Sequence, residues 1–156
     1  MTIEEIKAKV SSEEYDFLRT NEHLGANTIL LAVTGSHGHG IANENSDIDL
    51  RGITLNSRKE ILLGSDFGHV VSETTDTTVY SLRKVLSLLS KCNPYIIEML
   101  GCLPEHYLVL SDIGKQLINN RKRFLSKICI HTFGNYSTTL LRRLQGQTKE
   151  LTQKEM

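Results

Sequence analysis

The 156-residue sequence predicts an α+β fold in which strands of a mixed sheet come first and helices follow. Residues 28–33 form a short apolar run that stops at Thr34-Gly35-Ser36, as is typical of a buried strand. Residues 47–55 alternate between apolar and polar side chains with the period of a second strand. From residue 81 onward, apolar residues recur at helical spacing. Strands followed by helices favour α+β over alternating α/β.

The first half is expected to contain one helix and three strands. A helix is predicted over residues 3–20, where apolar residues recur at loosely helical spacing and acidic residues cluster early. Residues 35–46 are rich in glycine, which favours a loop with one helical turn. Residues 61–72 are interpreted as a hairpin or loop excursion. The β propensity of residues 76–80 predicts the third strand.

Helices are expected throughout the second half. An apolar stripe over residues 82–89 predicts one, and Asn93-Pro94 predicts a capped start for another that ends at Leu100. Asp112 is expected to cap a helix over residues 113–130, and a last helix is expected from Thr132. The predicted organisation is a core over residues 1–92 with a helical C-terminal part, residues 93–156, packed on it. That part either completes a small domain or is the truncated front of a longer one.

Composition excludes several classes of protein. The net charge is zero at pH 7, which argues against a broad nucleic-acid surface but leaves room for a small basic pocket that holds one triphosphate. The three cysteines, Cys92, Cys102 and Cys129, form no CxxC pair, so free thiols in a reducing compartment are expected. No signal peptide is evident, and no apolar run approaches the roughly 20 residues of a membrane span. A cytoplasmic location without a membrane partner is therefore expected, and the oligomeric state stays open.

The stretch that carries chemistry is Gly35-Ser36, followed after ten residues by Asp47-Ile48-Asp49. Gly35 has no Cβ, so backbone N–H groups can approach a ligand closely, and Ser36 adds a hydroxyl donor. A loop of this type that leads into a helical turn favours phosphate.

Asp47 and Asp49 are two residues apart on the expected strand, so both carboxylates should project from one face. Two anions that close raise each other's pKa unless a cation intervenes. Mg²⁺ uses such oxygen ligands, and two metal ions can activate an attacking hydroxyl and stabilise a leaving pyrophosphate. The alternative interpretation of these two residues alone is a solvated strand face.

The combined pattern resembles a known superfamily. Gly35, Ser36, Gly40, Ser46, Asp47 and Asp49 occupy without gaps the signature G-S-x-x-x-G-x-x-x-x-x-S-D-x-D of the DNA polymerase β-like nucleotidyltransferases. The continuation through Arg51-Gly52, with Asn93-Pro94 and Glu98-Met99-Leu100 downstream, resembles the YcgL/RlaP-type nucleotidyltransferases associated with RNA repair. The resemblance covers roughly residues 28–145. It implies the minimal nucleotidyltransferase fold, a site for Mg²⁺ or Mn²⁺ and a nucleoside triphosphate substrate.

The resemblance also implies a third metal-binding carboxylate on a later strand. The sequence offers Asp76, Glu73 and Asp66, and Asp76 is favoured because it opens the strand over residues 76–80. Its alternative interpretation is an ordinary turn aspartate. The family pattern can also place an acid immediately before the next helix, where this chain has Ser81. That departure supports the alternative of a catalytically inactive sensor that binds a nucleoside triphosphate.

Further residues are candidates for nucleotide binding. Arg51 is expected either to reach a phosphate or to pair with an aspartate. Tyr136 and Arg143 are candidates for base stacking and phosphate contact, and Ser46 for a phosphate contact beside the acids. His37 and His39 are expected to be loop residues without a metal role. A basic helical cluster is either a solvated face or a surface for an acceptor RNA; it comprises Lys115, Arg121, Lys122, Arg123 and Lys127.

The function expected from the sequence is transfer of a nucleoside monophosphate, AMP, from a triphosphate to a hydroxyl. Gly35 and Ser36 would hold the β- and γ-phosphates, while Asp47, Asp49 and Asp76 would bind two metal ions. Asp76 would also assist deprotonation of the acceptor, which is an RNA end, a protein side chain or a small molecule. Besides the sensor, the other alternative is an antitoxin-like protein that modifies or binds a toxin partner.

Overall fold

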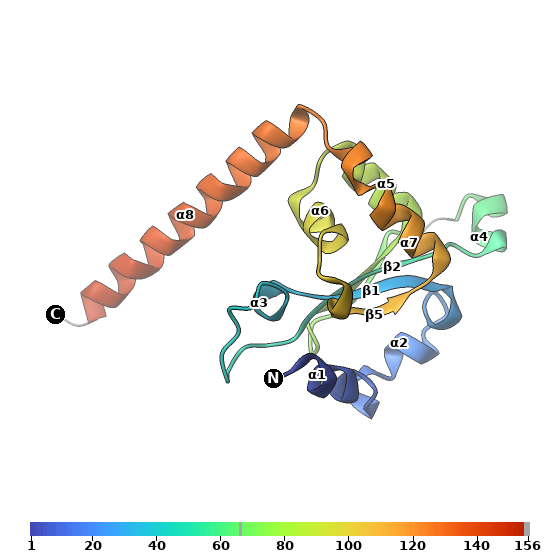
Figure 1. The fold of residues 1–156 in the computed structure, drawn as a ribbon, viewed down its shortest axis with the longest axis horizontal. Helices are drawn as coiled ribbons and strands as arrows, with labels where there is room; N and C mark the ends of the chain where they lie inside the picture. The colour runs from blue at the N-terminus through green and yellow to red at the C-terminus, as the bar shows by residue number, and fades with distance from the viewer. Residues whose placement is uncertain (66, 155–156) are drawn as a thin grey trace.

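A five-stranded mixed sheet forms the centre of the computed structural model, which describes residues 1–65 and 67–154 (Figure 1). The strand order is β3-β4-β2-β1-β5. β2 pairs in parallel with β4, and the other neighbours pair antiparallel. The strands are β1 (Thr28–Thr34), β2 (Asp49–Thr54), β3 (His69–Ser72), β4 (Thr77–Ser81) and β5 (Tyr107–Leu110). The predicted α+β class is confirmed.

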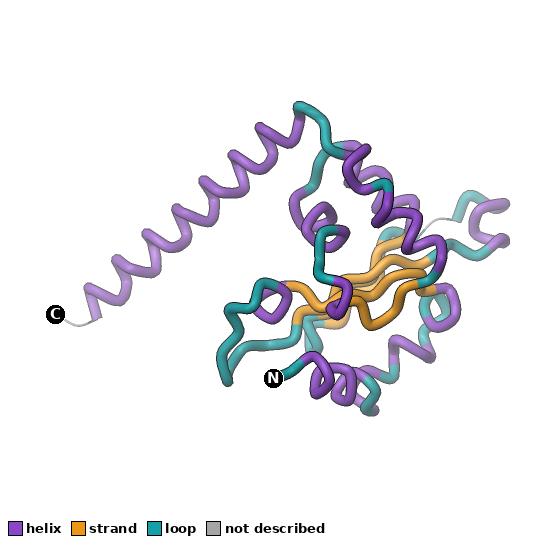
Figure 2. Tube along the Cα trace, in the orientation of Figure 1, coloured by secondary structure: helices purple, strands orange, loops and turns teal. Residues whose placement is uncertain are grey.

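Helices cover both faces of this sheet, so the body has three layers (Figures 1 and 2). α1 and α2 lie on one face, and α5, α6 and α7 lie on the other. The α-helices are α1 (Ile3–Val10), α2 (Phe17–Thr20), α3 (Gly35–Gly38), α4 (Arg58–Leu63), α5 (Leu82–Ser90), α6 (Pro94–Leu100), α7 (Asp112–Asn119) and α8 (Ile128–Lys154). The 3-10 helices are η1 (Glu13–Tyr15), η2 (Gly25–Asn27), η3 (Pro104–His106) and η4 (Arg121–Phe124).

β1 is apolar throughout because both of its faces are covered. Leu31 and Val33 pack with α1 and α2 on one side of the sheet. Leu30 and Ala32 pack with α5 and α6 on the other side. All four side chains are almost completely shielded from solvent. The continuous apolar run in the sequence is therefore a central strand buried on two faces.

The parallel pair β2–β4 brings two distant segments to one edge of the sheet. Leu50 lies opposite Thr77, and Thr54 lies opposite Ser81. The N–H of Leu50 donates to the backbone oxygen of Asp76 at 3.1 Å. Because parallel strands begin at the same edge, Asp49 and Asp76 become neighbours although they are far apart in sequence.

Several predicted boundaries are wrong. The helix expected over residues 3–20 is divided into α1, η1 and α2, because Ser11 ends α1 and Ser12 starts a new turn. The helix expected over residues 113–130 ends at Asn119, since the Asn120 amide and the Arg121 guanidinium hydrogen-bond to the last carbonyls of α7. The final helix begins at Ile128 rather than at Thr132.

Two elements were not predicted. α4 overlaps the start of the segment expected to be a hairpin or loop, and it begins at a capping box in which Ser57 and Glu60 exchange hydrogen bonds. β5 pairs with β1 at the edge of the sheet. The segment after residue 92 therefore contributes a strand to the central sheet as well as helices, and the predicted boundary between core and helical part cuts through one structural unit.

Ser81 lies at the end of β4 away from Asp76. At about 3.3 Å per residue, five residues of strand separate the two positions by roughly 16 Å. Ser81 is fully buried, and its hydroxyl caps α5 by accepting from the N–H of Lys84 at 3.2 Å. An acid at position 81 would thus face away from the aspartates, so Ser81 is not a missing partner of Asp49 and Asp76.

Ser81→Ala is expected to lower the free energy of unfolding by about 1 kcal/mol, because the cap of α5 is lost. Chemical denaturation measures this loss. Nucleotide and metal binding should stay unchanged, since the residue lies at the far end of the strand. A loss of metal affinity in a folded Ser81→Ala protein would contradict the placement of Ser81 outside the site.

α8 is a helix of 27 residues that extends well beyond the three-layered body (Figure 1). Its first turns approach α6, where the rings of Tyr136 and Tyr95 meet edge to face. Within residues 1–65 and 67–154, no helix combines the length and the apolar character that crossing a membrane requires.

Candidate functional site

A cavity of about 490 Å³ opens between α3, the start of β2, α6 and α8. Five of the predicted site residues line it: Gly35, Ser36, Asp49, Arg51 and Tyr136. They come from segments spread over a hundred positions of the sequence, and the sheet and α6 bring them together. This cavity is therefore the place where the predicted phosphate loop, one predicted metal ligand and the predicted aromatic side chain converge.

The turn at Gly35 lies directly against the carboxylate of Asp49. Gly35 has a φ of 60°, a left-handed conformation that favours glycine. A Cβ at this position would lie 1.8 Å from Oδ2 of Asp49, so no larger residue fits without displacing the carboxylate. The antiparallel pairing of Thr34 with Asp49 produces this approach. Backbone and acid thus share one small volume, as a phosphate–metal site requires.

Asp49, Asp76 and Arg51 form a charged cluster at this edge of the sheet. Nη2 of Arg51 lies 3.0 Å from Oδ1 of Asp76 and 3.7 Å from Oδ1 of Asp49. Nη1 of Arg51 also donates to the backbone oxygen of Asp76 at 2.7 Å. Asp76 has a φ of 37°, which is unusual for a residue other than glycine, and such conformations often occur at functional sites. The predicted pairing of Arg51 with an aspartate is therefore present.

The two carboxylates of this cluster shift each other's pKa in opposite directions. Burial raises the pKa of Asp49 to about 6, and the hydrogen bond and negative charge of Asp76 act in the same direction. The hydrogen bond from Asp49 lowers the pKa of Asp76, and Arg51 lowers it further. Asp49 therefore takes up a proton more readily than Asp76. A hard divalent cation relieves the same repulsion, so the oxygen donors of this pair fit such an ion chemically.

Asp47 and Ser46 face a different hollow from Asp49. β2 begins at Asp49, so the expectation that the strand begins at Asp47 is wrong: β1 ends at Thr34, and no strand partner remains for residues 47 and 48. Asp47 is exposed and lines a second hollow of about 280 Å³ together with Ser46 and Asp76. Its charge still contributes to the raised pKa of Asp49. Asp76 lies beside Asp49 and also lines the hollow of Asp47.

A metal ion held by all three acids would need Asp47 to turn toward Asp49. Among the described residues, no three acidic, histidine or cysteine side chains converge as a formed metal site. The other candidate acids do not change this result. Glu73 is exposed and lines the second hollow, and Asp66 lies outside the described residues.

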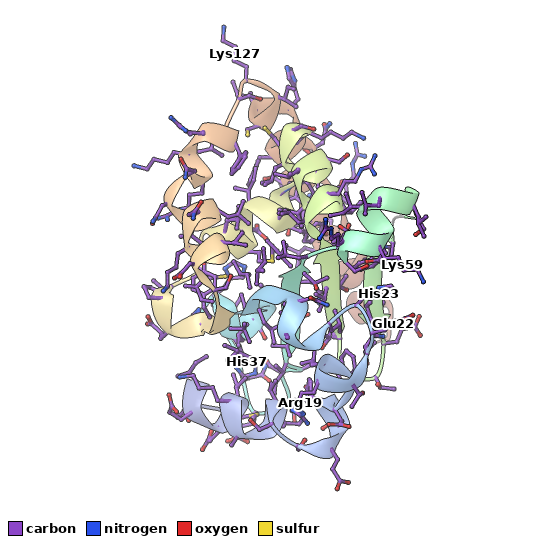
Figure 3. The ribbon with its side chains drawn as sticks, turned by 90° about the vertical axis from the view of Figure 1, so that its right-hand side faces the viewer. Arg19, Glu22, His23, His37, Lys59 and Lys127 are labelled. Carbon is purple, nitrogen blue, oxygen red and sulfur yellow. The ribbon has the colours of Figure 1, made fainter. Side chains whose placement is uncertain are left out.

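The loop between β1 and β2 is held by its own side chains. The Ser46 hydroxyl accepts from the N–H of Asn43 at 2.9 Å, so it stabilises the loop. His37 is buried, and its Nε2 lies 3.3 Å from the backbone oxygen of Ser46 (Figure 3). His39 instead lines the cavity. The two histidines that flank Gly38 therefore serve different parts of the loop.

The far end of the cavity is aromatic. The rings of Tyr95 and Tyr136 have centroids 5.3 Å apart and planes at 75°. Burial and the nearby charge of Glu98 raise the pKa of Tyr136, while Arg143 acts in the opposite direction. Arg143 is exposed and lies two helical turns after Tyr136 on α8, outside the cavity lining.

Among the cavity residues that were not predicted as site residues, Tyr95, Glu98 and Cys102 share one stretch of the chain, α6 and the turn after it. Their spacing is the signal that could have found them, since side chains three or four residues apart share one face of a helix, and Cys102 follows in the turn just after α6. None of the five basic residues of the cluster around α7 and η4 lines the cavity. Lys127, the last of them, projects away from the body at one end of the molecule (Figure 3).

Comparison with known proteins identifies a relative and a family. A phage T4 protein, described as an uncharacterized 38.9 kDa protein in the nrdC-mobD intergenic region, is 28% identical over 110 residues. The match covers 62% of this chain and 33% of the phage protein, so the chain spans about a third of that relative's length. No solved structure matches the chain. A family model described as the RNA repair pathway DNA polymerase beta family, RlaP, matches residues 8–156. The chain therefore belongs to the RlaP family of the DNA polymerase β superfamily, which indicates a nucleotidyltransferase-like function.

Proposed function

We propose that the chain transfers a nucleoside monophosphate, with AMP as the first expectation, from a nucleoside triphosphate to a hydroxyl. The observation that carries this proposal is the contact between the Gly35 turn and the Asp49 carboxylate, with Asp76 joined to Asp49 through Arg51. A triphosphate needs backbone donors and metal-binding carboxylates at the same point. This contact supports both requirements within one cavity of suitable size for a nucleotide.

Each residue of the cluster has a role in this proposal. Backbone N–H groups at Gly35 and the hydroxyl of Ser36 bind the β- and γ-phosphates. Asp49 and Asp76, joined by Asp47 once it turns toward them, would hold Mg²⁺ or Mn²⁺, which would supply charge stabilisation for the pyrophosphate and lower the pKa of an acceptor hydroxyl. Asp76 accepts the proton of that hydroxyl, because it lies between the cavity of Asp49 and the hollow of Asp47. Arg51, which pairs with Asp76 and Asp49 in the structure, would be free to bind a phosphate oxygen if metal ions neutralised those two carboxylates.

The stoichiometry of the step is that of nucleotidyl transfer. The acceptor oxygen forms a bond to the α-phosphorus, and the bond from that phosphorus to the bridging oxygen of pyrophosphate breaks. The proton leaves the acceptor for Asp76, and pyrophosphate carries away the electron pair. Because the family description names an RNA repair pathway, an RNA 3′-hydroxyl is the first acceptor to test, and a protein hydroxyl is the second. A cytoplasmic location stays a prediction.

The chain is expected to release one pyrophosphate for each labelled nucleotide that it transfers. The test incubates the full chain with each α-labelled triphosphate, Mg²⁺ or Mn²⁺, and an RNA or protein acceptor. Asp47→Asn with Asp49→Asn should abolish both products, whereas Asp112→Asn, an exposed acid paired with Lys115 on α7, should not. Thermal stabilisation by ATP without any pyrophosphate would instead support the inactive sensor. Capture of a toxin partner without nucleotide turnover would support the antitoxin-like alternative.

A further inference from the structure

One face of α6 runs along the cavity from its aromatic end to its phosphate end. Tyr95, Glu98 and Cys102 follow at intervals of three and four residues, and all three line the cavity. Tyr95 meets Tyr136 at the aromatic end. At the other end, Sγ of Cys102 donates to the backbone oxygen of Val33 at 3.7 Å, two residues before Gly35. Glu98 therefore lies between the two tyrosines and the Gly35 turn.

The carboxylate of Glu98 is a half-buried acceptor with unmet hydrogen-bonding capacity. Within residues 1–65 and 67–154, no group donates a hydrogen bond to it. Burial raises the pKa of Glu98, and the nearby charge of His39 acts against this increase. The negative charge of the same carboxylate raises the pKa of Tyr136. Glu98 is thus electrostatically coupled both to the loop that follows Gly35 and to the aromatic end.

A nucleotide placed in the proposed orientation brings its sugar to this carboxylate. The proposed function places its phosphates at Gly35 and Asp49; with its base on Tyr136, the residue that the sequence predicts for stacking, the sugar would lie between them. Tyr95 and Glu98 are about 4.5 Å apart along the axis of α6, since an α-helix rises 1.5 Å per residue. That offset is comparable with the distance between a base and its ribose.

We propose that Glu98 accepts a hydrogen bond from the ribose 2′-hydroxyl and thereby selects ribonucleoside over 2′-deoxyribonucleoside triphosphates. This inference rests on the proposed function, because it uses the same nucleotide orientation. A hydroxyl can donate, whereas an ionised carboxylate can only accept. When the 2′-hydroxyl is absent, the half-buried carboxylate loses this partner, and such a site discriminates strongly against the substrate that lacks the donor.

The expected discrimination is about 10- to 100-fold in the dissociation constant, the range for one hydrogen bond to a charged group. Calorimetric titration with ATP and with 2′-deoxyATP, each with Mg²⁺ and no acceptor, measures it on the full chain. Glu98→Ala should bind ATP as weakly as the wild type binds 2′-deoxyATP and should no longer distinguish the two. Glu98→Gln keeps an oxygen acceptor, so it should retain part of the preference.

Glu105→Ala is the matched control, because Glu105 is an exposed acid on η3 that does not line the cavity. It should discriminate like the wild type. Thermal melts verify that each variant folds. Equal affinity of the wild type for ATP and 2′-deoxyATP would overturn the inference, and so would discrimination that persists in folded Glu98→Ala.

The outcomes separate this inference from the proposed function. Discrimination that depends on Glu98, without any pyrophosphate release in the presence of acceptors, would support ribose selection and reject catalysis. Nucleotidyl transfer with equal use of ATP and 2′-deoxyATP would support catalysis and reject ribose selection. If neither nucleotide binds to the folded chain, both are rejected.

Discussion

Asp49→Asn is expected to reduce nucleotidyl transfer by about a thousandfold or more while it stabilises the fold. The loss of activity follows from removal of a charged ligand of the proposed metal site, because metal ions contribute several kcal/mol to such transition states. The gain in stability has a separate origin. The Asp49 carboxylate is 24% exposed and lies against a second carboxylate, so its charge is unfavourable in the folded chain without metal.

The pH dependence gives this prediction its sign. The pKa of Asp49 is about 6 in the folded chain and 3.8 in its ordinary state, so the folded form binds the proton more tightly. The resulting stability is present below the ordinary pKa and is lost as pH rises through 6. The wild type should therefore lose stability across that range, by less than the full Asp49 shift because the lowered pKa of Asp76 acts in the opposite direction, and the asparagine variant should not.

Denaturation of both proteins between pH 5 and pH 8, without divalent ions, measures the difference. As pH rises, the Tm of the variant should increase relative to that of the wild type. The expected increase is about 2–4 °C for each kcal/mol of difference in the free energy of unfolding. Asp112→Asn should show no comparable trend, since its carboxylate is exposed. Mg²⁺ should raise the Tm of the wild type more than that of Asp49→Asn. A variant less stable than the wild type at pH 8 would contradict the arrangement of the two acids.

Gly35→Ala is the second change with a large expected effect. The left-handed conformation costs an alanine about 1–2 kcal/mol, and the clash of its Cβ with the Asp49 carboxylate adds about 1–3 kcal/mol of strain. If the chain relaxes by moving Asp49, nucleotide and metal binding are lost instead. Combined denaturation and nucleotide titration should therefore show a large loss in stability, in binding or in both.

Gly40→Ala separates the two causes. Gly40 also has a positive φ, 69°, but a Cβ there meets no atom within 4 Å. The free energy of unfolding of Gly40→Ala should fall only by the cost of the left-handed conformation, about 1–2 kcal/mol. Combining Gly35→Ala with Asp49→Ala should recover part of the additional loss, with a coupling energy of about 0.5–3 kcal/mol. Equal effects of the two glycine substitutions, with no coupling to Asp49, would mean that the close approach has no energetic consequence.

Local parts of the fold could be predicted from the sequence. The run that became β1, the turn at Gly35 and the strand that carries Asp49 are adjacent in the chain, and their patterns are set by burial and glycine conformation. The capped start of α6 at Asn93-Pro94 was predicted for the same reason. The superfamily resemblance was confirmed because its motif lies within this local stretch.

Features that depend on tertiary pairing were harder to predict. Alternation placed Asp47 beside Asp49, but the pleat exists only where a partner strand continues, and β1 stops at Thr34. Asp76 was selected from the approximate start of a strand, while its contact with Arg51 depends on the register of β2 and β4. The positions of Tyr95 and Glu98 depend on how α6 docks against the sheet. No local pattern encodes that docking.

The parallel pairing of β2 and β4 also determines the stage of folding at which Asp49 and Asp76 become neighbours. Asp49 and Asp76 become neighbours only when β2 and β4 pair, which requires the segment between them to form a loop. Such non-local pairing is slow compared with the formation of local contacts. An unfolded chain offers a divalent ion only scattered carboxylates. If the proposed metal site exists, a divalent cation would bind the folded chain more tightly than the unfolded one and would shift the folding equilibrium toward the complete sheet by mass action.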